Sequence, residues 1–325
     1  MKPRLLFVHG VGGPRNPAAE LDSWLRALAE GGRHAGHARR FLDLTQGWAA
    51  DARFVYYGHL FGRPQEQGGD SDHLDDPESC DAAEAELIRE LFREAVTEWL
   101  AESTDEQEAA PLRHAQAQLD PDGGAQGAGA VVRQVLDCAN TLLSAPGLRT
   151  VGTWASAGLM VGQLRQVTRY LRRAEQDGTG TTLDTRVRRC LDQELDSGVP
   201  TIVLAHSLGT VVALEALHTH DVKVPLFVTL GSPIGMRAVV GRRVRPQPLR
   251  VPESVGRWLN FWDKDDFIAV RPRLEKTLLP NHQGVLPRSR RIDSDGPWVH
   301  PAVKYLAQPG VAGPVIEAIE RATAS

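Results

Sequence analysis

The sequence predicts an α/β protein built on a mostly parallel, doubly wound sheet. Short apolar runs occur at 4–10, 201–206 and 224–231, and each ends in a histidine or a glycine. Runs that are apolar at nearly every position are typical of parallel strands that helices cover on both faces. Segments with helical spacing of their apolar residues separate these runs near both ends of the chain. This alternation of strands and helices indicates a parallel sheet between two helical layers.

The composition is that of an ordinary globular protein. The chain has 325 residues, of which 42% are apolar, and its formal net charge is −4. This size suits one large α/β domain or two small ones, and the slightly acidic balance provides no general basic surface for nucleic acid. The three cysteines, Cys80, Cys138 and Cys190, are widely spaced and form no CxxC pair. We therefore expect reduced thiols in a cytoplasmic protein.

The amino-terminal stretch "MKPRLLFVHGVGG" has a basic start and a short apolar run. The run is shorter than the apolar region of a signal peptide, and no small-residue cleavage site follows it. It therefore predicts a first strand at 4–10. No apolar run in the sequence reaches the roughly 18 residues that a membrane-spanning helix needs.

The first third of the chain continues this pattern. Leucines and a tryptophan at helical spacing predict a helix at 20–30, and the aromatic run "DARFVYYGHLF" predicts a second strand at 51–61. The segment 62–79 is polar and acidic, and it lacks the glycine and terminal glutamate of an EF-hand loop. We expect an exposed loop there rather than a calcium site.

The middle of the chain is predicted to be helical. An amphipathic helix is expected at 81–102, a break in the Gly/Ala-rich stretch 117–130, and two further helices at 131–144 and about 154–174. This helical part precedes the strand at 201–206 and follows the first two strands.

We therefore expect a single domain over 1–325. Its core comes from about 1–61 and 184–325, and 81–183 forms a cap-like helical insertion over the sheet. In the second part of the core, the predicted elements are a helix at 184–198, strands at 201–206, 224–231 and 257–263, a weak strand at 285–293, and helices at 208–219 and 300–307.

The segment "AHSLG" lies between the predicted strand 201–206 and the predicted helix that follows it. This is the setting of a nucleophile elbow, a sharp turn that raises a serine hydroxyl above the sheet. Such a turn needs small residues two positions before and two after the serine, and these are Ala205 and Gly209. Ser207 is therefore the candidate nucleophile.

A serine nucleophile needs a base, and the base needs an orienting acid. Carboxylates cluster directly after the strand at 257–263, where active-site groups of parallel sheets gather. Among Asp263, Asp265 and Asp266 we favour Asp266, because an apolar pair that can tuck against the sheet follows it. Asp263 is the alternative acid.

His282 and His300 are the two histidines that follow these carboxylates in the chain. His300 lies after the last predicted strand and just before a predicted helix, so we expect it to be the base. His282 is expected on a surface loop. His206 precedes the serine and is expected to point away from it and to pack in the structure, because side chains alternate along a strand.

The glycine-rich stretch "VHGVGG" follows the first strand and is the candidate oxyanion loop. Gly10 and Gly12 let the backbone approach a substrate closely, and the backbone N–H groups of Val11 and Leu208 are the candidate donors. His9 is expected to support this loop. The stretch lacks the spacing of GxGxxG and a Walker lysine, so we expect no nucleotide. The mechanism requires no cofactor and no metal.

The motifs "FVHGVGG" and "LAHSLGT", followed by Asp266 and His300, resemble those of the α/β-hydrolase superfamily. Within it, "VHGVGG" and "AHSLG" resemble compact bacterial lipases, and "VTLGSPIG" at 228–235 is similar to lipase-like serine esterases and the inositol-deacylase-like group. The resemblance covers roughly 1–61 and 184–308. It implies an α/β-hydrolase fold. The large insertion of this chain lies before the nucleophile strand, whereas many relatives carry a lid between the sixth and seventh strands of the fold.

We expect a serine hydrolase that cleaves carboxylic esters of small molecules or lipids through an acyl-enzyme. The same triad also suits an amidase, a thioesterase or a peptidase, and the fold occurs in binding proteins without turnover. The sequence does not indicate an oligomeric state.

Two arginine-rich segments have alternative interpretations. The segment 159–175 has an apolar side and four arginines, so it is either a helix packed in the protein or a surface that contacts a membrane transiently. The loop 241–254 also carries four arginines and is either solvated or at the rim of the site.

Overall fold

The structure is a computed structural model that describes residues 2–12, 15–62, 80–120, 127–144, 156–294 and 299–324. Its centre is a six-stranded sheet with the order β2-β1-β3-β4-β5-β6, in which all neighbouring strands are parallel. The strands are β1 (Arg4–Val8), β2 (Asp51–Val55), β3 (Thr201–His206), β4 (Phe227–Leu230), β5 (Trp258–Asp263) and β6 (Pro287–Ile292). The predicted parallel α/β sheet is confirmed.

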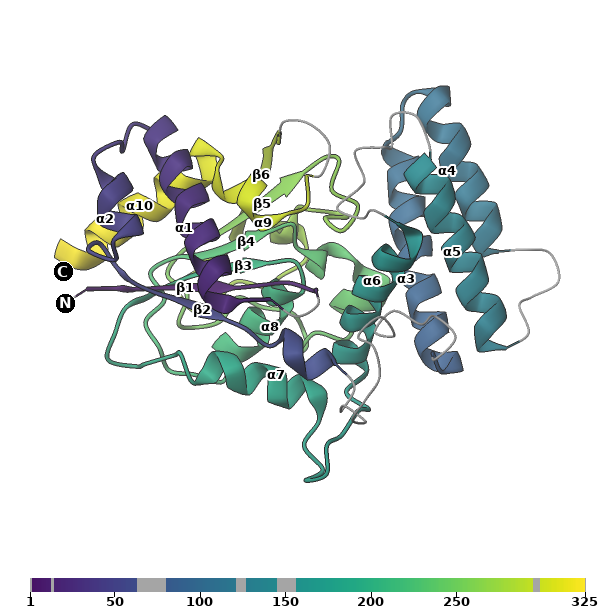
Figure 1. Cartoon of the computed structure of the whole chain (residues 1–325), viewed down its shortest axis with the longest axis horizontal. Helices are drawn as coiled ribbons and strands as arrows, with labels where there is room; N and C mark the ends of the chain where they lie inside the picture. Colours follow the sequence, from purple (N-terminus) through teal and green to yellow (C-terminus); the bar gives the residue numbers. More distant parts are fainter. Residues whose placement is uncertain are drawn as a thin grey trace.

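Helices cover both faces of this sheet (Figure 1). Alternate residues of β1 explain the two layers, because Leu5 and Phe7 pack in one apolar cluster and Leu6 and Val8 in the other. The first cluster includes α1 (Pro17–His34), α9 (Ala302–Leu306) and α10 (Pro309–Ala324), and the second includes α7 (Leu183–Asp192) and α8 (Leu208–Leu217). The short helix α2 (Arg40–Thr45) lies beside α1.

A group of helices stands between β2 and β3 in the chain and lies beyond the carboxyl ends of the strands (Figure 1). It consists of α3 (Ala82–Glu102), α4 (Glu106–Leu119), α5 (Ala128–Ser144) and α6 (Ala157–Arg172). Its apolar side chains are continuous with the cluster on one face of the sheet. Polar contacts also join α3 to the segment that follows β4. The carboxylate of Glu94 on α3 accepts hydrogen bonds from Ala238 N–H and Val239 N–H at 3.1 and 3.2 Å.

The sequence prediction missed α4. Its buried residues recur at helical spacing, but two of the four, Ala109 and Ala115, are alanines, and Pro111 lies within the helix. Small apolar side chains give a weak periodic signal, so this helix was not distinguished from its polar surroundings. The expected break therefore begins later than predicted, after Leu119.

The second strand and the end of the chain also differ from the prediction. The second strand ends at Val55, and Gly58–Phe61 forms a short 3-10 helix instead of continuing the strand. The predicted last helix is the short α9, and the longer α10 that follows it was not predicted. The predicted loop at 62–79 and the start of the helix predicted at 154–174 lie, apart from Gly62, outside the described residues.

The arginines of α6 form ion pairs within the protein. Arg165 contacts Glu84 at 2.8 Å, and Arg172 contacts Asp81 at 2.8 Å. The apolar face of the same helix is buried, including Met160 and Leu164. These contacts favour the interpretation of α6 as a packed helix. Among the described residues, no helix combines the length and the apolar character that a bilayer crossing requires.

Candidate active site

Ser207 occupies the sharp turn between β3 and α8. Its backbone has φ 53° and ψ −128°, a sparsely populated conformation for a residue with a side chain. The close approach of neighbouring backbone explains the glycines around it. A methyl group at Gly10 would lie 2.5 Å from Cβ of Ser207, and one at Gly209 would collide with the carbonyl oxygen of His9.

Hydrogen bonds hold the backbone of this turn on both sides. Ser207 N–H donates to the carbonyl of Leu230 at the end of β4, at 3.0 Å. The carbonyl of Ser207 accepts from the N–H and the hydroxyl of Thr210, at 2.9 and 2.7 Å. The surrounding structure therefore fixes the strained conformation of Ser207.

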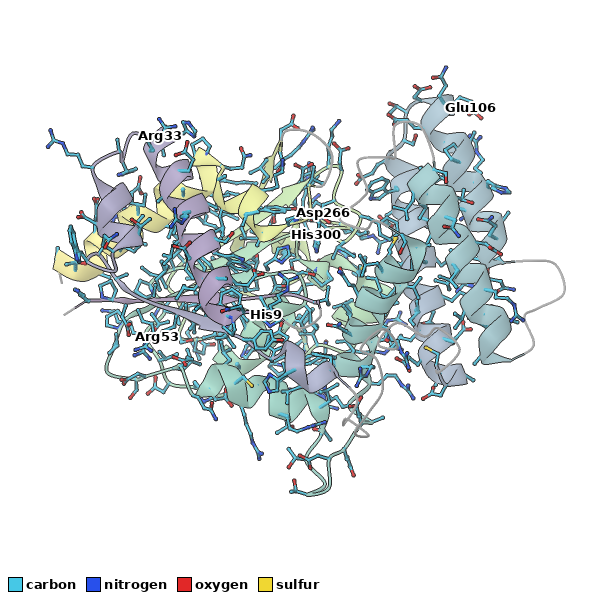
Figure 2. All side chains as sticks on the ribbon, in the orientation of Figure 1. His9, Arg33, Arg53, Glu106, Asp266 and His300 are labelled. Atoms are coloured by element: carbon cyan, nitrogen blue, oxygen red, sulfur yellow. The ribbon has the colours of Figure 1, made fainter. Side chains whose placement is uncertain are left out.

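Asp266 and His300 form a buried pair near the carboxyl ends of the strands (Figure 2). Nδ1 of His300 lies 2.9 and 2.8 Å from the two carboxylate oxygens of Asp266. A carboxylate accepts hydrogen bonds, so Nδ1 carries the proton of a neutral His300. In this tautomer Nε2 has the free electron pair that a general base needs.

Two further donors orient the carboxylate of Asp266. The hydroxyl of Tyr305 on α9 donates to Oδ2 at 2.6 Å, and Ile268 N–H donates to Oδ1 at 3.0 Å. Burial raises the pKa of this carboxyl, but the charge of His300 and the hydrogen bonds from His300, Tyr305 and Ile268 outweigh burial and lower the pKa of Asp266. Asp266 is therefore ionised at neutral pH.

Asp263, the alternative acid, occupies a different environment. Its two carboxylate oxygens accept hydrogen bonds from Ser294 N–H at 2.7 Å and Asp265 N–H at 3.0 Å. These bonds hold the loop after β5, so Asp263 supports the turn that presents Asp266. His282 is 83% exposed and pairs with Glu253, which agrees with its expected place on the surface.

His206 lies beside His300 instead of pointing away from the site. Its Nε2 is 2.6 Å from the carbonyl oxygen of His300, and the two ring centres are 4.6 Å apart. Burial, followed by the charge of His300, lowers the pKa of His206 well below its usual value. A neutral His206 therefore donates from Nε2 to the backbone of His300 and holds that residue next to the elbow.

His9 supports the loop that carries the candidate oxyanion donor. Its Nε2 accepts a hydrogen bond from Tyr57 N–H at 3.1 Å, and its carbonyl accepts one from the Tyr57 hydroxyl. The rings of His9 and Tyr57 are stacked, with their centres 4.1 Å apart. Burial and the nearby charge of Arg15 lower the pKa of His9 to about 3. His9 is thus a neutral support for the loop.

The two candidate oxyanion donors flank the serine. Leu208 is the first residue of α8, and the N–H groups of a first helical turn have no partner within the helix. Val11 follows Gly10, which lies directly against Ser207. Both candidate donors therefore belong to segments that adjoin Ser207.

Gln166 is a residue of this site that the sequence analysis missed. Its Oε1, on α6, accepts a hydrogen bond from Gly12 N–H at 3.0 Å. Gly12 has φ +142°, which favours glycine. The helical insertion therefore contacts the candidate oxyanion loop directly. No signal in the sequence connects positions so far apart.

Gly231 belongs to the segment 228–235, which resembles that of lipase-like serine esterases. The structure shows that its position has no room for a side chain. It has φ +54°, and a methyl group there would lie 2.6 Å from Oδ2 of Asp266 and 3.1 Å from Nδ1 of His300. The absence of a side chain at the end of β4 leaves room for the acid and the imidazole to meet.

Together these features define the chain as a parallel α/β protein with an elbow serine beside a buried Asp–His pair. No protein-family model and no curated protein matches the chain. The chemistry of the site is therefore inferred from its own geometry and from the motifs in the sequence.

Proposed function

We propose that the protein is a serine hydrolase of the lipase-like esterase type, which cleaves carboxylic esters through an acyl-enzyme. The observation that carries the proposal is the contact between Nδ1 of His300 and the carboxylate of Asp266, at 2.8 Å, beside the strained turn of Ser207. A serine, a histidine and a carboxylate from three strand ends are the components of a catalytic triad.

In the first step, the hydroxyl oxygen of Ser207 attacks the ester carbonyl. Nε2 of His300 accepts the hydroxyl proton, and the imidazole becomes an imidazolium. The ionised Asp266, held by Tyr305 and Ile268, stabilises this positive charge and keeps Nδ1 directed toward itself.

Negative charge then develops on the former carbonyl oxygen. The N–H groups of Val11 and Leu208 are the donors for this oxyanion, and each such donor typically contributes about 3 kcal/mol to the transition state. The close packing of Gly10 on Ser207 supports this assignment, because it brings the loop to the reacting carbon.

The tetrahedral intermediate collapses when His300 returns its proton to the leaving alcohol. Water enters, gives a proton to Nε2 of His300 and attacks the acyl carbon. The second tetrahedral intermediate then releases the carboxylic acid, and His300 returns its proton to the Ser207 oxygen, which restores the hydroxyl. The imidazole of His300 accepts and returns the proton in both halves of the reaction, so these steps need no metal and no cofactor.

The reaction is expected in the cytoplasm, and the three cysteines support this because none forms a disulfide. The resemblance to lipases and serine esterases favours an ester over an amide or a thioester. It also favours turnover over a purely binding role.

The first test is covalent labelling with a fluorophosphonate, which reacts with activated serines. The wild type should be labelled and Ser207→Ala should not. Ser232→Ala is the matched control, since Ser232 is a buried serine at the end of the neighbouring strand whose hydroxyl bonds Thr210 at 2.8 Å. An unlabelled wild type, folded by circular dichroism, would contradict the proposal.

The second test compares turnover of matched ester, thioester and amide substrates, together with nitrophenyl esters of increasing chain length with and without detergent micelles. Hydrolysis restricted to the ester, and lost in Ser207→Ala, supports the proposed class. Faster turnover of the amide or the thioester would assign the same triad to a different bond.

A further inference from the structure

A basic cavity lies at the end of the sheet opposite the candidate active site. It has a volume of about 690 Å³, and its lining includes Arg257, Arg288 and Arg321. Arg257 directly precedes β5, and Arg288 is the second residue of β6. The amino ends of the strands are thus at this cavity, whereas Ser207 and Asp266 follow the carboxyl ends. The length of the strands separates the two sites by roughly 15–20 Å.

A second, smaller cavity adjoins the first. It has a volume of about 220 Å³, and it shares Arg257 and Arg321 with the larger one while adding Lys223. Four cationic side chains, from β6, α10 and the segments before β4 and β5, therefore line these two neighbouring cavities.

Acidic groups do not balance this charge. Arg321 pairs with Glu317 at 3.1 Å, and Glu275 also lines the larger cavity. Within the described part of the chain, no ion pair joins Arg257 or Arg288 to a carboxylate. Burial and then the positive charges of Arg321, Arg290 and Arg288 lower the pKa of Arg257, with Glu317 acting in the opposite direction.

We propose that this cavity is a binding site for a small organic phosphate. A planar guanidinium matches the oxygens of a phosphate in a two-bond fork, and several arginines around one point favour an anion with more than one charge. The lining also includes the half-buried Val285 and the exposed Leu286. These apolar side chains suit the carbon skeleton of an organic phosphate better than inorganic phosphate alone.

Protection of a sheet edge explains only part of this charge. Charged side chains on an edge strand prevent pairing with other chains, and Arg288 and Arg290 lie on the edge strand β6. Arg257 precedes an interior strand and Arg321 lies on α10. Their convergence with Arg288 therefore calls for a different explanation, and a bound anion provides one.

The test measures binding of phenyl phosphate and of inorganic phosphate by calorimetry, at constant ionic strength, to the full chain carrying Ser207→Ala. This background separates the result from hydrolysis, so failure here leaves the proposed function untouched. Phenyl phosphate should bind at least tenfold more tightly than inorganic phosphate. Arg257→Gln should weaken its binding at least tenfold.

Arg53→Gln is the matched control. Arg53 is an exposed arginine on β2, the other edge strand, where it pairs with Asp51 at 3.1 Å. This variant changes the net charge by the same amount and should leave binding unchanged. Equal losses of phenyl phosphate affinity in both variants would indicate a nonspecific effect of charge and overturn the proposal. Absence of phenyl phosphate binding would also overturn it.

Thermal unfolding provides a second readout. Removal of a charge from a group of like charges relieves repulsion, so Arg257→Gln should melt at a higher temperature than its parent without ligand. It should also lose the stabilisation that phenyl phosphate gives the parent. A lower melting temperature with unchanged stabilisation by the ligand would make Arg257 a structural residue and contradict the proposed site.

Discussion

The hydroxyl of Tyr305 joins the carboxylate of Asp266 to the backbone of Asp263, the other candidate for the acid. It donates to Oδ2 of Asp266 at 2.6 Å and accepts a hydrogen bond from the backbone N–H of Asp263 at 3.2 Å. Burial, and then the negative charge of Asp266, raise the pKa of Tyr305 well above its usual value, so the hydroxyl keeps its proton. Tyr305 is therefore a permanent donor that positions the acid.

Tyr305→Phe should lower kcat of ester hydrolysis about tenfold, which corresponds to about 1.4 kcal/mol of transition-state stabilisation. The loss of this donor raises the pKa of Asp266, so the acid side of the pH–rate profile should move to higher pH. Tyr170→Phe is the control, because Tyr170 is also buried and donates to a carboxylate, that of Glu215, at 2.7 Å. Both variants should lose about 1–3 kcal/mol of stability, and only Tyr305→Phe should change the kinetics.

Gly231→Ala should abolish most of the activity. The added methyl group would displace the carboxylate of Asp266, which lies 2.6 Å from its position, and a shift of about 1 Å can lower a rate about 100-fold. Gly47→Ala is the matched control, because Gly47 also has a positive φ, +68°, but has open space around it. That variant should lose about 1 kcal/mol of stability and retain its rate. Equal activity of the two variants would contradict the placement of Gly231 against the acid.

Gln166→Ala should lower kcat about fivefold and leave KM nearly unchanged, because one neutral hydrogen bond contributes about 1 kcal/mol to the position of the oxyanion loop. Gln166→Glu keeps an oxygen acceptor for Gly12 N–H and should restore most of the rate. Gln118→Ala removes a comparable side-chain acceptor, bonded by Thr141 at 2.9 Å within the insertion, and should not affect kcat. A change in KM alone would assign Gln166 to substrate binding instead.

Stability should fall below about pH 6.5 because two buried histidines are neutral in the folded protein. Burial and the charge of Arg15 lower the pKa of His9 to about 3, and burial and the charge of His300 lower that of His206. The unfolded chain binds these protons near pH 6.5, so acid favours unfolding. The contribution of His9 is complete above pH 6.5 and is lost progressively as the pH falls toward 3.

Urea unfolding between pH 6.5 and 4.5 measures this effect. Each histidine should steepen the loss by up to about 1.4 kcal/mol per pH unit. In His9→Gln, the free energy of unfolding should fall less steeply with decreasing pH, by the contribution of one proton, whatever the effect of the substitution on absolute stability. His34→Gln removes a histidine with 52% side-chain exposure and should leave the slope unchanged. An unaltered slope in His9→Gln would show that His9 is protonated in the folded state.

The strands and the main motifs were predictable because each depends on neighbouring residues. An unbroken apolar run such as Ile202–Ala205 fits only a strand buried on both faces, and the small residues around Ser207 permit a sharp turn. Helix α4 and the end of β2 were predicted poorly, since alanines and aromatic residues give no clear period there.

The sequence by itself determined the parallel α/β class, the elbow at Ser207 and the short set of carboxylates and histidines that could join it. Only the tertiary structure decided that Asp266, rather than Asp263, meets His300, that His206 and Tyr305 hold this pair, and that Gln166 reaches Gly12. The physical reason is distance along the chain. A turn or a strand follows from local sterics and apolar spacing, whereas a hydrogen bond between residues 154 positions apart depends on how separate helices pack.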